Sequence, residues 1–357
     1  MENPLVPPTM FAWRKRKGNL EPIYEEIPVP PAPASGFLVK ILAAGVCHSD
    51  WSLLKTERNF PHYNEIYTLG HEGCGEIVRI GKEVQNSKHK LGDIVAVYAV
   101  PGCGSSSCGE CNRDLAHLCS KGQHHGIGQD GCFADYVAID ARAAVPLPKG
   151  VSPSEGAVAT DAGTTAYSAI VKRAEVKKGQ TVFLFGLGGL GFNALQVLLW
   201  IGARVIVSDT RETTLEEARK LGVPGEDIVP VGKLVTEFVH ENGLEDMIDT
   251  VADFVGMKQT FSDAQNIVRY GGKILYVGTL SNETVVDPKI CIKKRLTVLF
   301  NYGGQYSDVV EVLDLISKGI IRPQVENGKL EDFPKVLKDL HEGKIKSRMA
   351  LIPSHSR

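Results

Sequence analysis

The chain has 357 residues, of which 43% are hydrophobic and 23% charged, as in a soluble globular protein long enough for two domains. Its formal net charge is −2, so no global field would recruit nucleic acid or an anionic membrane. The N-terminus lacks a secretory signal, and the most apolar stretch is broken by glycines. We therefore expect a cytoplasmic protein that neither spans a membrane nor binds nucleic acid.

Short β-type segments punctuated by Gly and Pro fill the first part of the chain. Residues 37–43, 75–80 and 94–100 are examples. Segments of this kind predict an antiparallel, barrel-like domain.

Three segments of this first part carry residues that suit a catalytic metal. Cys47 lies in CHSDW and His71 in GHEG, and Asp161 in ATDAGTTAYSA is a candidate for a third ligand. A catalytic zinc takes three protein ligands and keeps one position open. Taken alone, the cysteine and the histidine fit ordinary core positions and the aspartate fits a helix cap, so the residues by themselves leave both interpretations open.

A cysteine cluster occupies residues 102–119: Cys103, Cys108, Cys111 and Cys119. The last two gaps, x2 and x7, suit a zinc knuckle, whereas the first is x4 where x2 is usual. A longer turn can still bring Cys103 to a tetrahedral vertex. Four thiolates would leave no open position, which predicts a structural zinc. The alternative is a serine-rich loop of reduced, unliganded thiols.

From Thr164 onward, apolar strands alternate with helical patterns. Strands are predicted at 181–185, 204–209, 249–255 and 273–278, with helices between them; after the run 295–301 come a helix at 307–319 and a final strand around 349–352. Strands that are apolar on both faces and alternate with helices predict a doubly wound, mostly parallel sheet.

A glycine-rich turn, Gly186-Leu187-Gly188-Gly189-Leu190-Gly191, directly follows the predicted strand 181–185 and opens a helix. In this context the turn predicts a dinucleotide site, with the pyrophosphate at the helix N-terminus. Asp209, which ends the next strand, can accept hydrogen bonds from the ribose hydroxyls and would repel a 2′-phosphate, favouring NAD(H). Arg211 could pair with such a phosphate, which leaves NADP(H) open. A glycine turn without a ligand is the structural alternative.

Taken together and in order, the motifs resemble those of zinc-dependent medium-chain alcohol dehydrogenases over nearly the whole chain. They are CHSDW, GHEGCGEIV, GD-x-V at 92–95, the cysteine cluster, DGCFADYV at 130–137, GLGGLG and GKIKSR at 343–348. The resemblance implies a GroES-like catalytic domain at 1–162 and 300–357, with a structural-zinc lobe at about 102–119. A Rossmann NAD-binding domain at 163–299 would be inserted into it.

The resemblance also implies two zinc ions per chain. The catalytic zinc would be held by Cys47, His71 and Asp161, with Glu72 as a neighbour that can exchange onto it, and the structural zinc by the four clustered cysteines. The implied reaction is hydride transfer between NAD(H) and an alcohol, aldehyde or ketone whose oxygen is polarised by zinc.

In the implied mechanism, Asp50 orients His71 and Ser49 starts the proton relay. Many relatives have histidine where this chain has Ser52, so the end of the relay stays open.

Further residues fall where relatives touch the cofactor: His48, Thr165, Leu187, Phe254, Val277, Gly278 and Arg348. Trp51, Phe60 and Tyr98 could line the substrate pocket, although ordinary core packing explains them equally well. The remaining cysteines, Cys74, Cys132 and Cys291, are expected to be free and buried.

Two alternatives to an NAD(H)-dependent alcohol dehydrogenase follow from the same residues. One is an NADPH-dependent reductase of a specialised C=O, C=N or conjugated C=C substrate. The other is a catalytically inactive relative, which would be expected to lack the ligands that this chain retains. The alcohol dehydrogenase and the reductase would each act on a small molecule and, as relatives do, form a homodimer or homotetramer.

Overall fold

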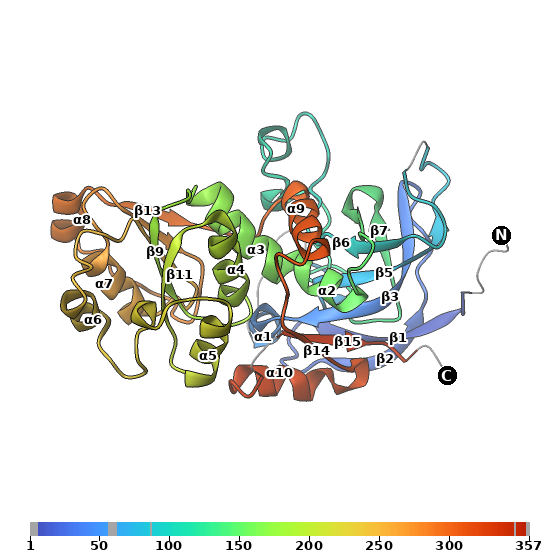
Figure 1. The fold of residues 1–357 in the computed structure, drawn as a ribbon. Helices are drawn as coiled ribbons and strands as arrows, with labels where there is room; N and C mark the ends of the chain where they lie inside the picture. Colours follow the sequence, from blue (N-terminus) through green and yellow to red (C-terminus); the bar gives the residue numbers. More distant parts are fainter. Residues whose placement is uncertain (1–5, 56–62, 86–87, 346–347, 355–357) are drawn as a thin grey trace. The chain divides into compact units, whose positions relative to one another are not determined.

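The computed structural model describes residues 6–55, 63–85, 88–345 and 348–354. These residues form two compact units (Figure 1). The first contains the described parts of 1–161, 305–319 and 323–357, and the second contains 162–304 and 320–322.

The first unit is built on sheets of mostly antiparallel strands, as the sequence predicts. Its strands are β1 (Thr9–Arg16), β2 (Ile23–Pro28), β3 (Gly36–Val46), β4 (Ile66–Thr68), β5 (Glu72–Ile80), β6 (Ile94–Val97), β7 (Tyr136–Asp140), β8 (Ala144–Pro146), β14 (Val325–Lys329) and β15 (Arg348–Ile352). One sheet has the order β2-β1-β4 and the other β14-β15-β3-β5-β6-β8, with β7 also on β3. The β14–β15 pair is parallel.

Strand β15 lies antiparallel beside β3, with Ala350 opposite Gly45 (Figure 1). This pairing brings the C-terminal part of the chain next to the segment that leads to Cys47. The helices of this unit are α1 (His48–Lys55), α2 (Pro153–Val158), α9 (Tyr306–Ser317) and α10 (Phe333–His341). Short 3-10 turns lie at Cys111–Arg113, Ala116–Leu118, Ala141–Ala143 and Leu330–Asp332.

The second unit contains the predicted parallel sheet. Its strands are β9 (Thr181–Phe185), β10 (Arg204–Ser208), β11 (Thr250–Asp253), β12 (Lys273–Tyr276) and β13 (Thr297–Phe300), in the order β10-β9-β11-β12-β13. Each neighbouring pair of strands in this sheet is parallel, and all residues of β9 are buried. The apolar runs predicted as strands are therefore confirmed.

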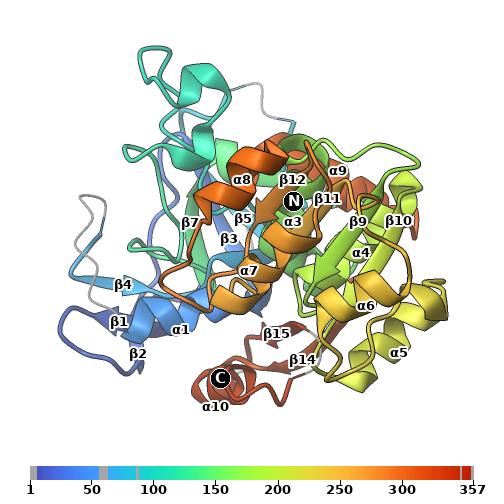
Figure 2. The same ribbon diagram turned by 90° about the vertical axis from the view of Figure 1, so that its left-hand side faces the viewer.

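Helices cover both faces of this sheet, with α4 on one side and α7 on the other (Figures 1 and 2). They are α3 (Thr164–Tyr167), α4 (Gly191–Ile201), α5 (Glu212–Lys220), α6 (Val235–Glu241), α7 (Lys258–Ile267) and α8 (Pro288–Lys294), with a 3-10 turn at Gly225–Asp227 and a π-helical segment at Ser168–Arg173. The strand order reverses between β9 and β11, where doubly wound sheets bind ligands at the carboxyl ends of the strands.

Each unit has its own apolar core. Phe37, Ile41 and Phe133 are fully buried in the first, and Phe183 and Phe261 in the second. None of the helices in the described part of the chain combines the length and the apolar composition needed to cross a bilayer.

Candidate functional site

The first unit brings together the four residues predicted around a catalytic metal. Cys47 follows β3, His71 precedes β5, and Glu72 begins β5, which pairs with β3. Asp161 lies in a π-helical turn, Ala159–Gly163, that continues α2. The ligand atoms of Cys47, His71, Glu72 and Asp161 all lie within 4.8 Å of one another.

The donor atoms of this cluster fit a zinc ion. Cys47 Sγ lies 3.3 Å from Asp161 Oδ2, and His71 Nε2 lies 3.8 Å from the same oxygen. Tetrahedral zinc, with Zn–S near 2.3 Å and Zn–N or Zn–O near 2.0–2.2 Å, holds neighbouring ligand atoms roughly 3.3–3.8 Å apart. One sulfur, one imidazole and one carboxylate are also ligand types that zinc prefers.

Asp50, which is fully buried, holds two of these residues in place. Its Oδ2 accepts a hydrogen bond from the backbone N–H of Cys47 at 2.9 Å, and its Oδ1 lies 3.1 Å from His71 Nδ1. Burial lowers the pKa of His71, but the carboxylates of Asp50 and Asp161 outweigh it and raise this pKa well above its ordinary value. A proton on Nδ1 thus faces Asp50 and directs Nε2 toward Asp161 and Cys47.

Replacing Asp50 with asparagine should weaken zinc binding at this cluster by about 10–100-fold, the usual effect of losing the carboxylate behind a histidine ligand. Titration of the apoprotein with zinc in competition with a chelator measures the effect. Asp314→Asn on α9 is the matched control because the Asp314 carboxylate pairs with Lys318, the residue just after this helix, away from the predicted metal ligands. Equal zinc affinity in the two variants would contradict the role of Asp50.

Glu72 has a partner that its sequence motif did not indicate. Its carboxylate forms an ion pair with the guanidinium of Arg348, and both side chains are almost completely buried. Arg348 also lies 3.9 Å from Asp161 Oδ2. A Cβ at Gly45, opposite Glu72 across the β3–β5 pair, would collide with the Glu72 carboxylate, so glycine is needed there. The structure thus places Arg348, a predicted cofactor contact, beside the predicted metal ligands.

Helix α1 carries the remaining predicted residues of this region. Ser49 Oγ lies 3.6 Å from Cys47 Sγ, and Ser52 lies one turn further on the same helix. Desolvation and the positive charges of Arg348 and His341 lower the pKa of His48. His48 and Arg348, both predicted to contact the cofactor, therefore lie close enough for their charges to interact.

The cysteine cluster forms a second candidate metal centre. Cys103 Sγ lies 3.7 Å from Cys111 Sγ, and Cys108 Sγ lies 3.6 Å from Cys119 Sγ. All four sulfurs lie within 4.8 Å of one another. Tetrahedral zinc with four thiolates separates its sulfurs by roughly 3.8 Å. The longer first gap therefore does not keep Cys103 from its vertex, and the donor set fits a closed zinc site.

In the second unit, the glycine turn has the geometry of a dinucleotide cradle. Gly186 has φ +82°, a conformation that favours glycine, and a Cβ at Gly191 would collide with the carbonyl oxygen of Gly186. A Cβ at Gly188 would meet no atom within 4 Å, so the backbone there is open to a ligand. Helix α4 begins at Gly191, so the positive N-terminal end of its dipole lies at this turn.

Asp209 follows β10 at the same edge of the sheet, and Arg211 lies directly against it. Asp209 Oδ2 accepts from the Leu187 N–H at 2.8 Å, which ties Asp209 to the glycine turn. Arg211 Nε donates to Asp209 Oδ1 at 3.1 Å. Burial raises the pKa of Asp209, but Arg211 and the two backbone N–H donors hold this pKa below its ordinary value, so the carboxyl is ionised.

Three other predicted cofactor residues lie at the carboxyl ends of neighbouring strands. Phe254 follows β11, and Val277 and Gly278 follow β12, where both of their N–H groups donate to the Asp253 carbonyl. Because the strands are parallel, these residues share one sheet edge with the glycine turn. Thr165 is buried in α3.

Two of the three residues predicted to line a substrate pocket pack against other rings in the first unit. Trp51 stacks on His341, with ring centroids 3.9 Å apart, and packs against the core of the first unit. Tyr98 is buried edge-on to Tyr306. Phe60 lies outside the described residues.

Of the remaining cysteines, Cys74 and Cys132 are buried as expected. Cys291 is partly exposed, which corrects the prediction that it is buried, because α8 has no fully buried residue.

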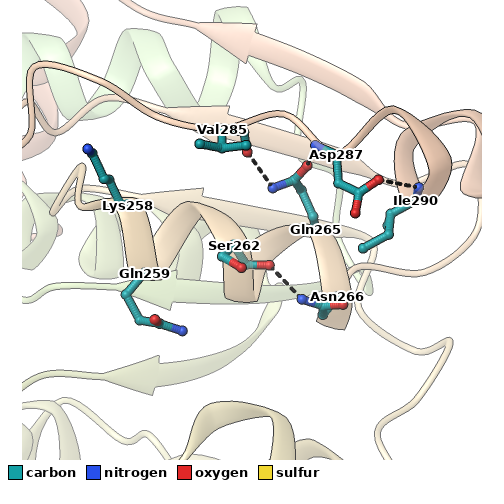
Figure 3. Close-up of a pocket in the computed structure, with 8 residues that line it drawn as sticks. All are labelled: Lys258, Gln259, Ser262, Gln265, Asn266, Val285, Asp287 and Ile290. Carbon is teal, nitrogen blue, oxygen red and sulfur yellow. Dashed lines mark hydrogen bonds between the residues drawn. The ribbon is translucent and has the colours of Figure 1, made fainter.

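A separate pocket of about 450 Å³ lies between α7 and the segment that leads into α8 (Figure 3). It is lined by Lys258, Gln259, Ser262, Gln265, Asn266, Val285, Asp287 and Ile290. Gln265 donates to the Val285 carbonyl and accepts from the Asp287 N–H, whereas Lys258 and Gln259 pair with Glu283 and Asp263 outside the lining. The pocket contains none of the predicted site residues.

Two family models match the chain. Residues 33–149 match the alcohol dehydrogenase GroES-like domain, and residues 189–318 match the zinc-binding dehydrogenase domain. These matches cover the segments that hold Cys47, His71, the cysteine cluster and part of the glycine turn.

Individual proteins are similar over nearly the full length. An alcohol dehydrogenase of Geobacillus stearothermophilus is 30% identical over 92% of this chain and 94% of its own. Alcohol dehydrogenase 2 of Caenorhabditis elegans is 30% identical over 98% and 99%. The solved structure of acetophenone reductase from Geotrichum candidum in complex with NAD is 30% identical and superposes with a TM-score of 0.87 over 98% of both chains.

Proposed function

Because the chain belongs to the zinc-type medium-chain dehydrogenase/reductase family, we propose that it catalyses hydride transfer between NAD(H) and an alcohol, aldehyde or ketone. The observation that carries the proposal is the convergence of Cys47, His71 and Asp161 in a geometry that fits zinc. An inactive relative would have no need to keep this donor set together. Bound zinc would polarise the substrate oxygen, and the nicotinamide would carry the hydride.

In this proposal, the catalytic zinc is held by Cys47, His71 and Asp161, which leaves one position for substrate. Arg348 holds the Glu72 carboxylate in an ion pair, which would restrain any shift of Glu72 onto the metal. The second zinc, held by Cys103, Cys108, Cys111 and Cys119, would be structural. Clustered cysteines can bind metal only while they stay reduced, and the cytoplasm is a reducing compartment. We therefore propose a cytoplasmic location.

Ser49 is the proposed first proton carrier because its hydroxyl lies beside Cys47. A hydroxyl can accept a proton from the substrate oxygen while it donates its own onward. Ser52, one turn along α1, is the next hydroxyl on the same side of the helix and would pass the proton to solvent.

The proposed cofactor contacts are those that the family resemblance implies. The glycine turn would bind the pyrophosphate through backbone N–H groups, and His48 and Arg348 would supply positive charge to it. Phe254, Val277, Gly278 and Thr165 would contact the rest of the cofactor. Asp209 is the proposed partner of the adenosine ribose.

One observation favours a second candidate, an NADPH-dependent reductase of a specialised C=O, C=N or conjugated C=C substrate. The Arg211 guanidinium donates hydrogen bonds to both carboxylate oxygens of Asp209, and it would be close enough to pair with the 2′-phosphate of NADP(H). The replacement of a relay histidine by Ser52 also fits a reaction with a different route for the proton.

We also propose that the chain forms a homodimer or homotetramer through β13. This strand has the sequence TVLF and pairs with β12 on one side. Its last residue, Phe300, is 57% exposed. An apolar sheet edge of this kind is normally covered by a partner strand. Light scattering should give a mass of two or four chains, and the mass of a single chain at micromolar concentration would contradict the proposal.

Cofactor oxidation followed by absorbance tests the proposed reaction. NADH and NADPH are compared in parallel against aliphatic and aromatic aldehydes, ketones and conjugated enals. Turnover of simple carbonyls with NADH supports the first candidate. Activity restricted to NADPH with an enal or another specialised substrate supports the second, and no turnover by protein loaded with zinc and cofactor contradicts both.

A further inference from the structure

Cys103 is the member of the cysteine cluster that the unusual first gap separates from the others. Its neighbours Gly102 and Gly104 have φ angles of +69° and +66°, in the left-handed region that favours glycine. Glycine loses more conformational freedom on folding than other residues and has no side chain to pack. The backbone around Cys103 therefore depends on contacts with other parts of the chain to hold its position.

The added residues of the gap form a turn of their own. The hydroxyls of Ser105 and Ser107 are hydrogen-bonded to each other at 2.8 Å. The Ser105 carbonyl accepts from the Cys108 N–H at 3.1 Å. These bonds close the exposed serines into a turn beside Cys108, and they do not tie Cys103 to the sheets of the first unit.

The side chain of Arg142 contacts the glycines on both sides of Cys103. Its Nη1 donates to the Gly102 carbonyl at 2.9 Å. A Cβ at Gly104 would lie only 2.4 Å from the same nitrogen, so the guanidinium packs directly against the Gly104 backbone. One guanidinium thus restrains the chain just before and just after the cysteine.

Asp140, the last residue of β7, fixes this guanidinium to the sheet. Its Oδ1 accepts from Arg142 Nε and from Arg142 N, both at 2.9 Å. Its backbone N–H donates to Gln123 Oε1 at 2.9 Å, and Gln123 forms a β-bridge with Gly102. Burial raises the pKa of Asp140, but its bonds to Arg142 hold this pKa below its ordinary value. A chain of contacts therefore runs from β7 through Asp140 and Arg142 to Cys103.

We propose that Arg142 is a positioning residue of the second metal centre. It keeps the Cys103 thiolate at its vertex although the first gap of the cluster is x4 where x2 is usual. Doubling the length of a flexible loop lowers its closure constant by only about threefold, which one charge-assisted hydrogen bond can offset. The inference rests on the proposed structural zinc.

Two substitutions test the role of the guanidinium. Arg142→Gln removes both the cation and the planar fork. Arg142→Lys keeps a cation but cannot hold Asp140 and Gly102 with one rigid group. In the positioning role, the glutamine variant should therefore have the larger effect and the lysine variant an intermediate one.

Arg269→Gln in the second unit is the matched control. Arg269 makes the same two kinds of contact, since its Nε donates to Asp249 Oδ1 at 2.8 Å and its Nη1 donates to the Tyr270 carbonyl at 2.7 Å. Its side chain is 36% exposed, against 40% for Arg142. It belongs to neither group of predicted metal ligands.

The measurement is the metal affinity of the cysteine cluster in full-length protein carrying Cys47→Ser, whose catalytic site has no thiolate. Cobalt(II) added to the metal-free protein gives thiolate-to-metal charge-transfer absorbance that arises from the cluster, and competition with zinc gives the zinc affinity. Arg142→Gln should weaken this affinity about tenfold, the low end for loss of a partner behind the ligands, because Arg142 is partly exposed. Its charge-transfer absorbance should also fall, since Cys103 no longer stays at its vertex. Arg269→Gln should change neither value.

Equal zinc affinities and equal cobalt spectra of Arg142→Gln and Arg269→Gln would overturn the inference. So would a loss of Tm in Arg142→Gln that is the same for metal-free and zinc-loaded protein, because a residue that positions a ligand must change the stabilisation that zinc supplies. The premise fails in a different way: if protein with Arg142 intact gave no charge-transfer absorbance, the second metal centre itself would be wrong.

Discussion

Replacing Cys47 with serine is expected to lower kcat/KM by at least about a thousandfold, while the fold and the affinity for NADH remain. The substitution removes the thiolate from the proposed catalytic zinc site. Lewis-acid stabilisation worth about 4 kcal/mol corresponds to roughly a thousandfold in rate. Steady-state kinetics, NADH titration and metal analysis together test this prediction, and the variant should lose one of two zinc ions per chain.

The matched control is Cys291→Ser, which makes the same chemical change at a partly exposed thiol on α8. Cys291 Sγ donates to Gln265 Oε1 at 3.4 Å, a contact that a serine hydroxyl can replace. This variant should keep its activity and its zinc. Normal turnover by Cys47→Ser would contradict the assignment of Cys47 as a metal ligand.

Replacing Cys111 with serine should produce the opposite pattern, with a large loss of stability and a smaller loss of catalysis. Its sulfur lies 3.7 Å from that of Cys103 at the second metal centre, and removing one of four thiolates opens the site. Zinc that binds only the folded lobe contributes its binding energy to folding. A loss of a few kcal/mol should lower Tm by about 5–10 °C.

Thermal unfolding and zinc content measure this effect, again with Cys291→Ser as the control. The two cysteine predictions also check each other, because each variant should lose a different zinc ion. If Cys111→Ser kept both its Tm and its zinc content, the cysteine cluster would not be a structural metal site.

The parallel sheet could be predicted from the sequence because its strands carry their signal locally. The run 181–185 (TVFLF) is apolar on both faces, and it becomes β9, whose residues are all buried. The cysteine cluster is local as well: its sulfurs meet within one loop of 102–119, as the spacing of the last three cysteines and the family resemblance predicted.

The partner of Glu72 could not be predicted in this way. Arg348 reaches it because β15 pairs with β3, and β3 pairs with β5. That register is set by the packing of strands from opposite ends of the chain, which no local pattern in GKIKSR or GHEGCGEIV encodes. The need for glycine at position 45 follows from the same register, since Gly45 faces Glu72.

The pairing of Arg211 with Asp209 lies between these cases. The sequence places the two residues close together and leaves their competing effects on cofactor choice open. Only the side-chain geometry reveals that the guanidinium chelates both carboxylate oxygens. The exposure of Cys291 was missed for a related reason, because the apolar residues around it do not reveal that α8 lies at the surface.

Removal and return of zinc in the unaltered protein tests the central claim most directly. The purified protein is treated with a chelator, its metal content is followed, and NADH oxidation with an aldehyde is measured before and after zinc is restored. The proposed mechanism predicts that loss of the zinc held by Cys47, His71 and Asp161 abolishes turnover but leaves NADH binding, and that added zinc restores turnover. Full activity in protein without zinc would contradict it.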